Sequence, residues 1–189
     1  MVASPARERI LETAFRLFYA HGLRAVGVDW IIAESGVAKA TFYKYFPSKD
    51  ELVLAYLDRV DTIWSGQLHA AAEAAGPDPA DQLVGLFGAL HAACRRDGYR
   101  GCAFINAAAE ATPGTPVHER TLAHKRAVLA WVRELAEQAG AEDPAGLARS
   151  ITLLLDGGLA SGALDADPAA ADRASSSARV LVSAAIAAH

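Results

Sequence analysis

The 189-residue chain has only two cysteines, and it lacks both a long apolar run and an apolar N-terminus. No run approaches the roughly 20 residues that a membrane span requires. Arg7, Glu8 and Arg9 stand where a signal peptide would need an apolar stretch. We therefore expect a cytoplasmic protein with no membrane partner. In such a reducing compartment Cys94 and Cys102 are interpreted as buried free thiols, with a redox pair as the alternative.

Motifs of catalysis and metal binding are also missing. The sequence contains no Gly-x-Ser-x-Gly elbow, no phosphate-binding loop and no His-Glu-x-x-His spacing. The two cysteines have no matching pair of histidines. We therefore expect no catalytic residue, no metal and no cofactor, and an enzyme is kept only as a second hypothesis.

Signals for β-strands are absent, whereas signals for helix starts are frequent. No alternating β-branched run is bounded by tight-turn pairs. Ser, Thr and Asp are favoured as helix caps and proline at the first helical position. Five dipeptides have this form: Ser4-Pro5, Asp78-Pro79, Thr115-Pro116, Asp143-Pro144 and Asp167-Pro168. These signals predict an all-α fold. Because 52% of the residues are hydrophobic, a sizeable core can be buried.

Helical periodicity and the positions of Gly and Pro predict nine helices. Their approximate ranges are 5–20, 28–35, 39–45, 48–74, 79–96, 102–111, 116–139, 144–163 and 168–188. We place a domain boundary near Asp50, inside or just before the fourth helix. This gives an N-terminal domain over 1–50 and a larger domain over 51–189 that share one element.

The stretch from Gly36 to Leu52 is typical of a helix-turn-helix. Gly36 can adopt the left-handed backbone that ends one short helix before the next. A basic, aromatic helix follows over 39–45, and Pro47 stops it. Ser48 and Glu51 then form a capping box that starts the fourth helix. The short helix between the turn and the capped helix is predicted to be a recognition helix.

The charge distribution agrees with a DNA-binding head. Residues 1–50 hold seven basic and five acidic residues, whereas the rest of the chain has a net charge of −6. The residues predicted to contact DNA are Lys39, Thr41, Tyr43, Lys44, Tyr45 and Lys49. Their side chains are of types that reach phosphates and base edges in the major groove. Each base contact discriminates by only about 1–3 kcal/mol, so two paired heads on a palindromic double-stranded operator are expected.

These features together resemble the tetracycline-repressor (TetR) family of one-component bacterial regulators. The resemblance is carried by Gly22, Ile31, Gly36-Val37, Lys39-Ala40-Thr41-Phe42-Tyr43, Tyr45-Phe46, Ser48-Lys49 and Leu52, with Phe15 and Phe18 in the first helix. The segment 100–106 is similar to one often seen at the family's sixth helix. The resemblance implies a homodimer that pairs through the helices over 144–163 and 168–188. It also implies a nucleoid-associated repressor that a small molecule releases from its operator.

Three departures from the family's pattern involve four residues. Gly27 and Ala38 stand where the family usually has a hydroxyl residue at the start of a helix, and alanine is a poor cap. Trp30 and Ile32 replace a polar and a small residue, respectively. These departures leave a third hypothesis open, in which the chain is a ligand-binding protein of the same fold that has lost or altered DNA binding.

The larger domain offers candidates for an effector site. An aromatic-lined cavity with few polar groups suits a lipophilic molecule. The residues predicted to bind it are Trp64, Phe87, Leu90, His91, Phe104, Asn106, His124, Trp131, Leu155 and Asp156. The alternative for the apolar members is ordinary core packing. Asp156 interrupts an apolar run, so we expect it to have a partner if it is buried, or to lie at the dimer interface.

Overall fold

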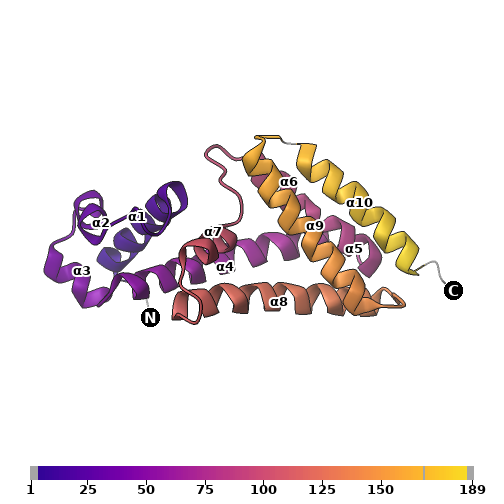
Figure 1. The fold of residues 1–189 in the computed structure, drawn as a ribbon, viewed down its shortest axis with the longest axis horizontal. Coiled ribbons are helices and arrows are strands. Elements are labelled where there is room, and N and C mark those ends of the chain that lie inside the picture. The colour runs from indigo at the N-terminus through magenta and orange to yellow at the C-terminus, as the bar shows by residue number, and fades with distance from the viewer. Residues whose placement is uncertain (1–3, 168, 187–189) are drawn as a thin grey trace. The chain divides into compact units, whose positions relative to one another are not determined.

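The computed structural model of the chain describes residues 4–167 and 169–186, and all regular elements within these ranges are α-helices (Figure 1). The predicted all-α fold is confirmed. The chain forms two compact units. The first comprises the described residues up to Asp61 together with 103–123, and the second comprises 62–102 together with the described residues from 124 onward. No helix in the described part of the chain is long and apolar enough to cross a membrane.

The first unit contains the three N-terminal helices, one further complete helix and the starts of two others. These are α1 (Pro5–His21), α2 (Val28–Ser35), α3 (Lys39–Tyr45), the start of α4 (Lys49–Ala74), α7 (Ala103–Glu110) and the start of α8 (Pro116–Gln138). Ile10, Ala14 and Leu17 recur at helical spacing on α1 and are buried. The ring of Tyr56 lies edge-on to that of Phe18, with 5.5 Å between the centroids, so α4 packs on the same core.

The second unit contains the remainder of α4 and α8 together with four complete helices. These are α5 (Pro79–Gly85), α6 (Phe87–Cys94), α9 (Pro144–Leu164) and α10 (Ala169–Ile186), and α9 lies beside α10 (Figure 1). Small residues permit this packing. A Cβ atom on Gly158 would lie 2.5 Å from the Leu90 side chain and 3.3 Å from that of Ala174. Glycine at this position of α9 therefore lets α6 and α10 approach closely.

Most of the predicted caps form. The carboxylates of Asp78 and Asp143 each accept a hydrogen bond from a helix amide at 2.9 Å, and that of Asp167 accepts one from Ala169 at 2.8 Å. The helix predicted to begin at Pro168 is described from Ala169. Pro168 and residues 187–188 of that prediction lie outside the described residues.

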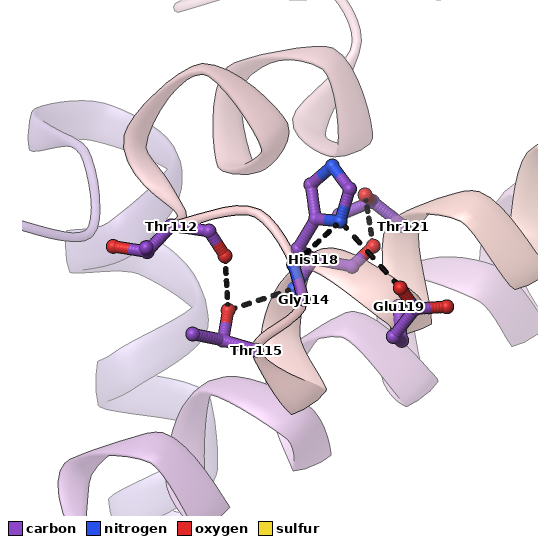
Figure 2. Close-up of polar contacts among 6 residues, drawn as sticks. All are labelled: Thr112, Gly114, Thr115, His118, Glu119 and Thr121. Carbon is purple, nitrogen blue, oxygen red and sulfur yellow. Dashed lines mark hydrogen bonds and ion pairs between the residues drawn. The ribbon is translucent and has the colours of Figure 1, made fainter.

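The start of α8 is held by its capping threonine (Figure 2). The Thr115 hydroxyl donates to the Thr112 carbonyl at 2.7 Å and accepts from the His118 amide at 3.4 Å. The Gly114 amide donates to Nδ1 of His118, also at 3.4 Å. The Pro/Gly loop before α8 is thus closed by local hydrogen bonds, as its Thr-Pro sequence predicts.

Two details of the predicted helices are wrong. Ser4 makes no side-chain cap on α1, because its hydroxyl is hydrogen-bonded to the Tyr45 hydroxyl at 2.7 Å. The single helix expected over 79–96 is divided into α5 and α6 around Leu86. Leu86 keeps helical dihedral angles, but the Ala89 amide bonds its carbonyl three residues back, at 3.1 Å, which tightens this turn.

Both cysteines are free thiols, as expected. Cys102 is buried and Cys94 is half-buried beside Gly162 of α9. Burial raises the pKa of the Cys94 thiol, although a hydrogen bond with Tyr99 acts in the opposite direction. The thiolate is the reactive form of cysteine, so this environment makes Cys94 less reactive.

Candidate nucleic-acid interface

The turn before α3 has the geometry that its sequence predicts. Gly36 ends α2 with φ +64° and ψ 25°, in the left-handed region that favours glycine, and its amide bonds the Ile32 carbonyl at 3.1 Å. α3 then begins at Lys39. Phe42 within the helix and Phe46 at its C-terminal cap are 0% and 3% exposed, so their side chains hold α3 against the protein core. Both phenylalanines are core residues. Their burial fixes which face of α3 is left for other contacts.

The six residues predicted to contact DNA all lie on α3 or at the start of α4. Lys39, Tyr43 and Lys44 are exposed, whereas Thr41, Tyr45 and Lys49 are half-buried. Tyr43 is 44% exposed and packs edge-on to Phe42, with 5.3 Å between the ring centroids. Its ring is therefore positioned by the core while its hydroxyl remains available for hydrogen bonding.

Tyr45 has partners within the protein. Its hydroxyl shares a hydrogen bond with Ser4, and the Lys44 ammonium lies 5.7 Å from the centre of its ring. These contacts connect the start of α1 to the end of α3. A phosphate contact by Tyr45 stays a prediction, and its observed contacts are structural.

Both helix starts in this region lack a side-chain cap. Gly27 and Ala38 have extended backbone before α2 and α3, and neither provides a capping hydrogen bond. Asp29 lies in the first turn of α2, where its negative charge interacts favourably with the helix dipole. It also accepts a hydrogen bond from the Lys39 ammonium at 3.3 Å. No local sequence pattern predicts this contact between α2 and α3.

The exposed side of α2 carries a second pair of charges. Arg16 of α1 donates to the Glu34 carboxylate at 2.9 Å. This hydrogen bond, together with the arginine's charge, lowers the pKa of Glu34, and a hydrogen bond from Trp30 adds to the effect. Trp30 is 39% exposed, and its ring centroid lies 5.0 Å from that of His21. Its contacts with Glu34 and His21 hold the large Trp30 ring at this surface position.

The turn between α1 and α2 is clamped by the end of α7. The two carboxylate oxygens of Glu110 accept hydrogen bonds from the backbone amides of Leu23, at 3.0 Å, and Arg24, at 2.6 Å. Nε of Arg24 donates in return to the Glu110 carbonyl at 2.9 Å. Gly22 makes room, because a Cβ atom at that position would lie 2.7 Å from Oε1 of Glu110. The sequence does not predict this clamp, for which Gly22 is the one local signal.

A second link within the first unit joins α8 to α4. The Arg120 guanidinium donates to Asp58 and to Asp61, each at 2.7 Å, and lies 5.9 Å from the centre of the Phe104 ring. Burial is the largest single influence on the pKa of Arg120 and lowers it, but the hydrogen bonds that Arg120 donates to the two aspartates, together with their charges, raise the pKa overall. The arginine is thus fully charged and held by both carboxylates.

The ten residues predicted to bind an effector are divided between the two units, with Phe104 and Asn106 in the first and the other eight in the second. Five of them are at most 2% exposed: Phe87, Leu90, Phe104, His124 and Leu155. Trp64, His91, Trp131 and Asp156 are half-buried, and Asn106 is exposed. Their joint role as an effector site stays a prediction.

Three of these residues have contacts that define their surroundings in the second unit. Asp156 forms a close ion pair with Lys125, which gives it the partner that we expected. Trp131 stacks on His69, with 4.1 Å between the ring centroids. Nδ1 of His91 lies 3.4 Å from the Asp172 carboxylate, beside an open groove of about 520 Å³ between α5, α6 and α10.

Comparison with known proteins supports a helix-turn-helix regulator of this fold. The family model for bacterial regulatory proteins of the tetR family matches residues 10–56, which include most of α1 and all of α2 and α3. A TetR-family transcriptional regulator from Streptomyces coelicolor is 38% identical in sequence, with 96% of each chain covered and a TM-score of 0.89. A second tetR transcriptional regulator, from Streptomyces avermitilis, is 28% identical and superimposes with a TM-score of 0.86, covering 96% of this chain and 98% of that one.

A curated relative matches a short stretch of the chain. The uncharacterised helix-turn-helix transcriptional regulator YxaF of Bacillus subtilis (strain 168) is 46% identical over 50 residues. That match covers 26% of this chain and 26% of the relative.

Proposed function

Because the chain belongs to the TetR family of bacterial transcriptional regulators, we propose that it is a repressor that binds a palindromic operator as a homodimer and is released by a small lipophilic effector. Members of the family bind DNA through a helix-turn-helix, dimerise and are not enzymes. Repression, the palindrome and the effector are parts of the proposal. It places the protein in the cytoplasm, on the nucleoid.

The observation that carries the proposal is the construction of α3. Two buried phenylalanines fix the helix, and Tyr43 and Lys44 project from its exposed side. A tyrosine hydroxyl and a lysine ammonium suit phosphate contacts, which set the register of a recognition helix in the groove. Thr41 and Lys39 lie nearer the start of α3. The threonine can contact a thymine methyl, and the lysine can donate to a guanine edge.

The exposed apolar side chains of α9 and α10 support a homodimer. Leu153, Leu164 and Val180 are 74%, 84% and 68% exposed, although aliphatic residues are usually buried. A shallow groove of about 220 Å³ lies between the two helices and is lined by Leu153, Gly157 and Ala174 among others. A second copy of these helices would cover the exposed side chains in a four-helix interface.

The proposal is tested by selecting operators from random duplex DNA and measuring the affinity of variants for the selected sequence. Tyr43→Ala and Lys44→Ala should abolish operator binding while dimerisation and helicity stay unchanged. Arg126→Ala is the matched control, because Arg126 is an exposed cation on α8, outside the helices proposed to dimerise, and it should bind like the wild type. Selection of a palindrome supports the dimeric reader, whereas unchanged affinity of both α3 variants would contradict the assignment.

The effector is tested on the same operator. Trp131→Ala should change the response to an inducer and leave operator affinity intact, because Trp131 stacks on His69 in the second unit. A second candidate function is a ligand-binding protein that has lost DNA binding, and the uncapped starts of α2 and α3 favour it. Failure to select any sequence with a folded dimer would support that candidate.

A further inference from the structure

The ion pair between α2 and α3 affects the charge that the recognition helix presents. Lys39 is the first residue of α3, and its ammonium lies 3.3 Å from the carboxylate of Asp29 on α2. Both side chains are largely exposed, at 66% and 88%. The pair therefore forms on the surface, where either partner can reach another ion.

Lys44, the other lysine of α3, has different contacts. Within the described residues Lys44 forms no ion pair, and its ammonium lies over the ring of Tyr45. A cation over an aromatic ring keeps its full charge for an approaching phosphate. Of the two lysines of the recognition helix, Lys44 therefore offers a free charge and Lys39 a charge already neutralised by a carboxylate.

We infer that Asp29 is a specificity-determining residue, which withholds Lys39 from phosphates and so weakens binding to non-operator DNA more than binding to the operator. This inference rests on the proposed function. It assigns to α2 a role in choosing between sequences, although Asp29 itself need not contact a base.

The reason lies in the exchange of ions when DNA is bound. A lysine that neutralises a phosphate releases a counterion, and this release drives sequence-independent binding. If Lys39 moves to a phosphate, Asp29 loses its partner and is left as an unpaired negative charge close to the DNA backbone. The loss of this ion pair offsets the gain from counterion release, so Lys39 adds little to binding on a DNA that offers only phosphates.

At an operator the balance differs. A guanine edge offers two acceptors, O6 and N7, to a lysine placed at the start of a recognition helix. That contact exists only at the right base pair, and it can offset the loss of the Asp29 contact. The carboxylate therefore lowers non-specific affinity while it leaves most of the specific affinity in place.

If Asp29 served only to stabilise α2, its replacement would give a different result. Its charge in the first turn of α2 stabilises a helix whose cap position is Gly27. Removing that charge would lower stability slightly but would not alter how many ions are exchanged on DNA binding. The dependence of affinity on salt separates the two roles.

The experiment measures affinity for the selected operator and for a scrambled duplex of equal length at several salt concentrations. The proteins are the wild type, Asp29→Asn, Lys39→Gln, the double variant and Glu34→Gln. Glu34 is the matched control, because it is another acid of α2 that is paired with a cation. Circular dichroism and sedimentation confirm that each variant is a folded dimer.

For Asp29→Asn we expect the affinity for scrambled DNA to rise about threefold, in keeping with the strength of a surface ion pair. The slope of log affinity against log salt should steepen by about 0.9, which corresponds to one more phosphate contact. Operator affinity should rise less. Glu34→Gln should leave the slope unchanged, and Asp29→Asn should have no effect in the Lys39→Gln background.

Four results would overturn the inference. An unchanged slope for Asp29→Asn would show that the carboxylate does not withhold Lys39. An undiminished effect in the Lys39→Gln background, or an equal effect of Glu34→Gln, would show that any negative charge on α2 repels DNA. Absence of binding by the wild type to either duplex would refute the proposed function as well, and so the two failures are distinguishable.

Discussion

Replacing Glu110 with alanine should destabilise the first unit, because one carboxylate there holds two consecutive backbone amides. Its oxygens accept from Leu23 at 3.0 Å and from Arg24 at 2.6 Å. Hydrogen bonds to a charged acceptor are stronger than those between neutral groups. The turn between α1 and α2 has no other carboxylate partner for these amides among the described contacts.

The magnitude follows from the burial of the two amides. Leu23 is 9% exposed, so its amide would be left without a partner, at a cost of about 1–3 kcal/mol. Arg24 is exposed, so water can replace the lost acceptor and its contribution is small. We therefore expect Glu110→Ala to lower the free energy of unfolding by about 2 kcal/mol. For a protein of this size the midpoint of thermal unfolding should fall by about 4–8 °C.

Thermal and urea unfolding measure the loss, and amide hydrogen exchange locates it. Exchange at Leu23 should accelerate in Glu110→Ala, and Glu110→Gln should show an intermediate effect because it keeps one acceptor oxygen. Glu137→Ala is the control, since Glu137 pairs with Arg133 on the surface of α8, and it should change stability by less than about 0.5 kcal/mol. Unchanged exchange at Leu23, with stability like that of the control, would refute the reasoning.

Four further predictions concern other contacts. Arg120→Gln leaves the carboxylates of Asp58 and Asp61 without their cation. Since the guanidinium is partly buried, the free energy of unfolding measured in urea titrations should fall by about 2 kcal/mol. A change under about 0.5 kcal/mol would contradict this. Leu153→Glu puts a charge on the apolar surface of α9 and should convert dimers to folded monomers in sedimentation experiments. Glu34 has its pKa lowered by Arg16, so its stabilising effect should be present above pH 4.5 and vanish as the pH falls through the folded-state pKa; the stability difference between wild type and Glu34→Gln, measured from pH 7 downward, checks this sign. Alkylation of Cys94 in the native protein should be slower than that of the unfolded chain at pH 8, because burial raises the thiol pKa.

Features that depend on neighbouring residues could be predicted from the sequence. Gly36 adopts the left-handed backbone that its position before α3 predicts, and Asp78 and Asp143 cap the helices that follow them. Phe42 and Phe46 are buried because their spacing puts both on one side of a short helix. Each of these outcomes is decided within a few residues along the chain.

Contacts between distant segments could not be predicted in the same way. Glu110 lies 87 residues from Leu23, and no local pattern specifies which turn its carboxylate reaches. Ser4 was predicted to cap α1, but a hydroxyl 41 residues away is its partner. The Asp29–Lys39 pair is closer in sequence, yet it depends on how the turn at Gly36 orients two helices.

The division of the helix at Leu86 has a similar cause. Its sequence is compatible with one continuous helix, and Leu86 retains helical dihedral angles. Gly85 packs against α4 so closely that a Cβ atom would lie 2.4 Å from the Ala75 side chain. The approach of another helix is a tertiary feature, which helical periodicity does not report.

The proposed function is tested most directly by a footprint of the purified protein on its own upstream DNA, repeated across salt concentrations. We expect protection of a palindrome, with an affinity that falls steeply as salt rises, because the contacts of a dimeric groove reader include many phosphates. Tyr43→Ala should remove the protection. Protection that is independent of salt and of Tyr43, or a folded dimer that protects neither this region nor any sequence selected from random DNA, would contradict the account.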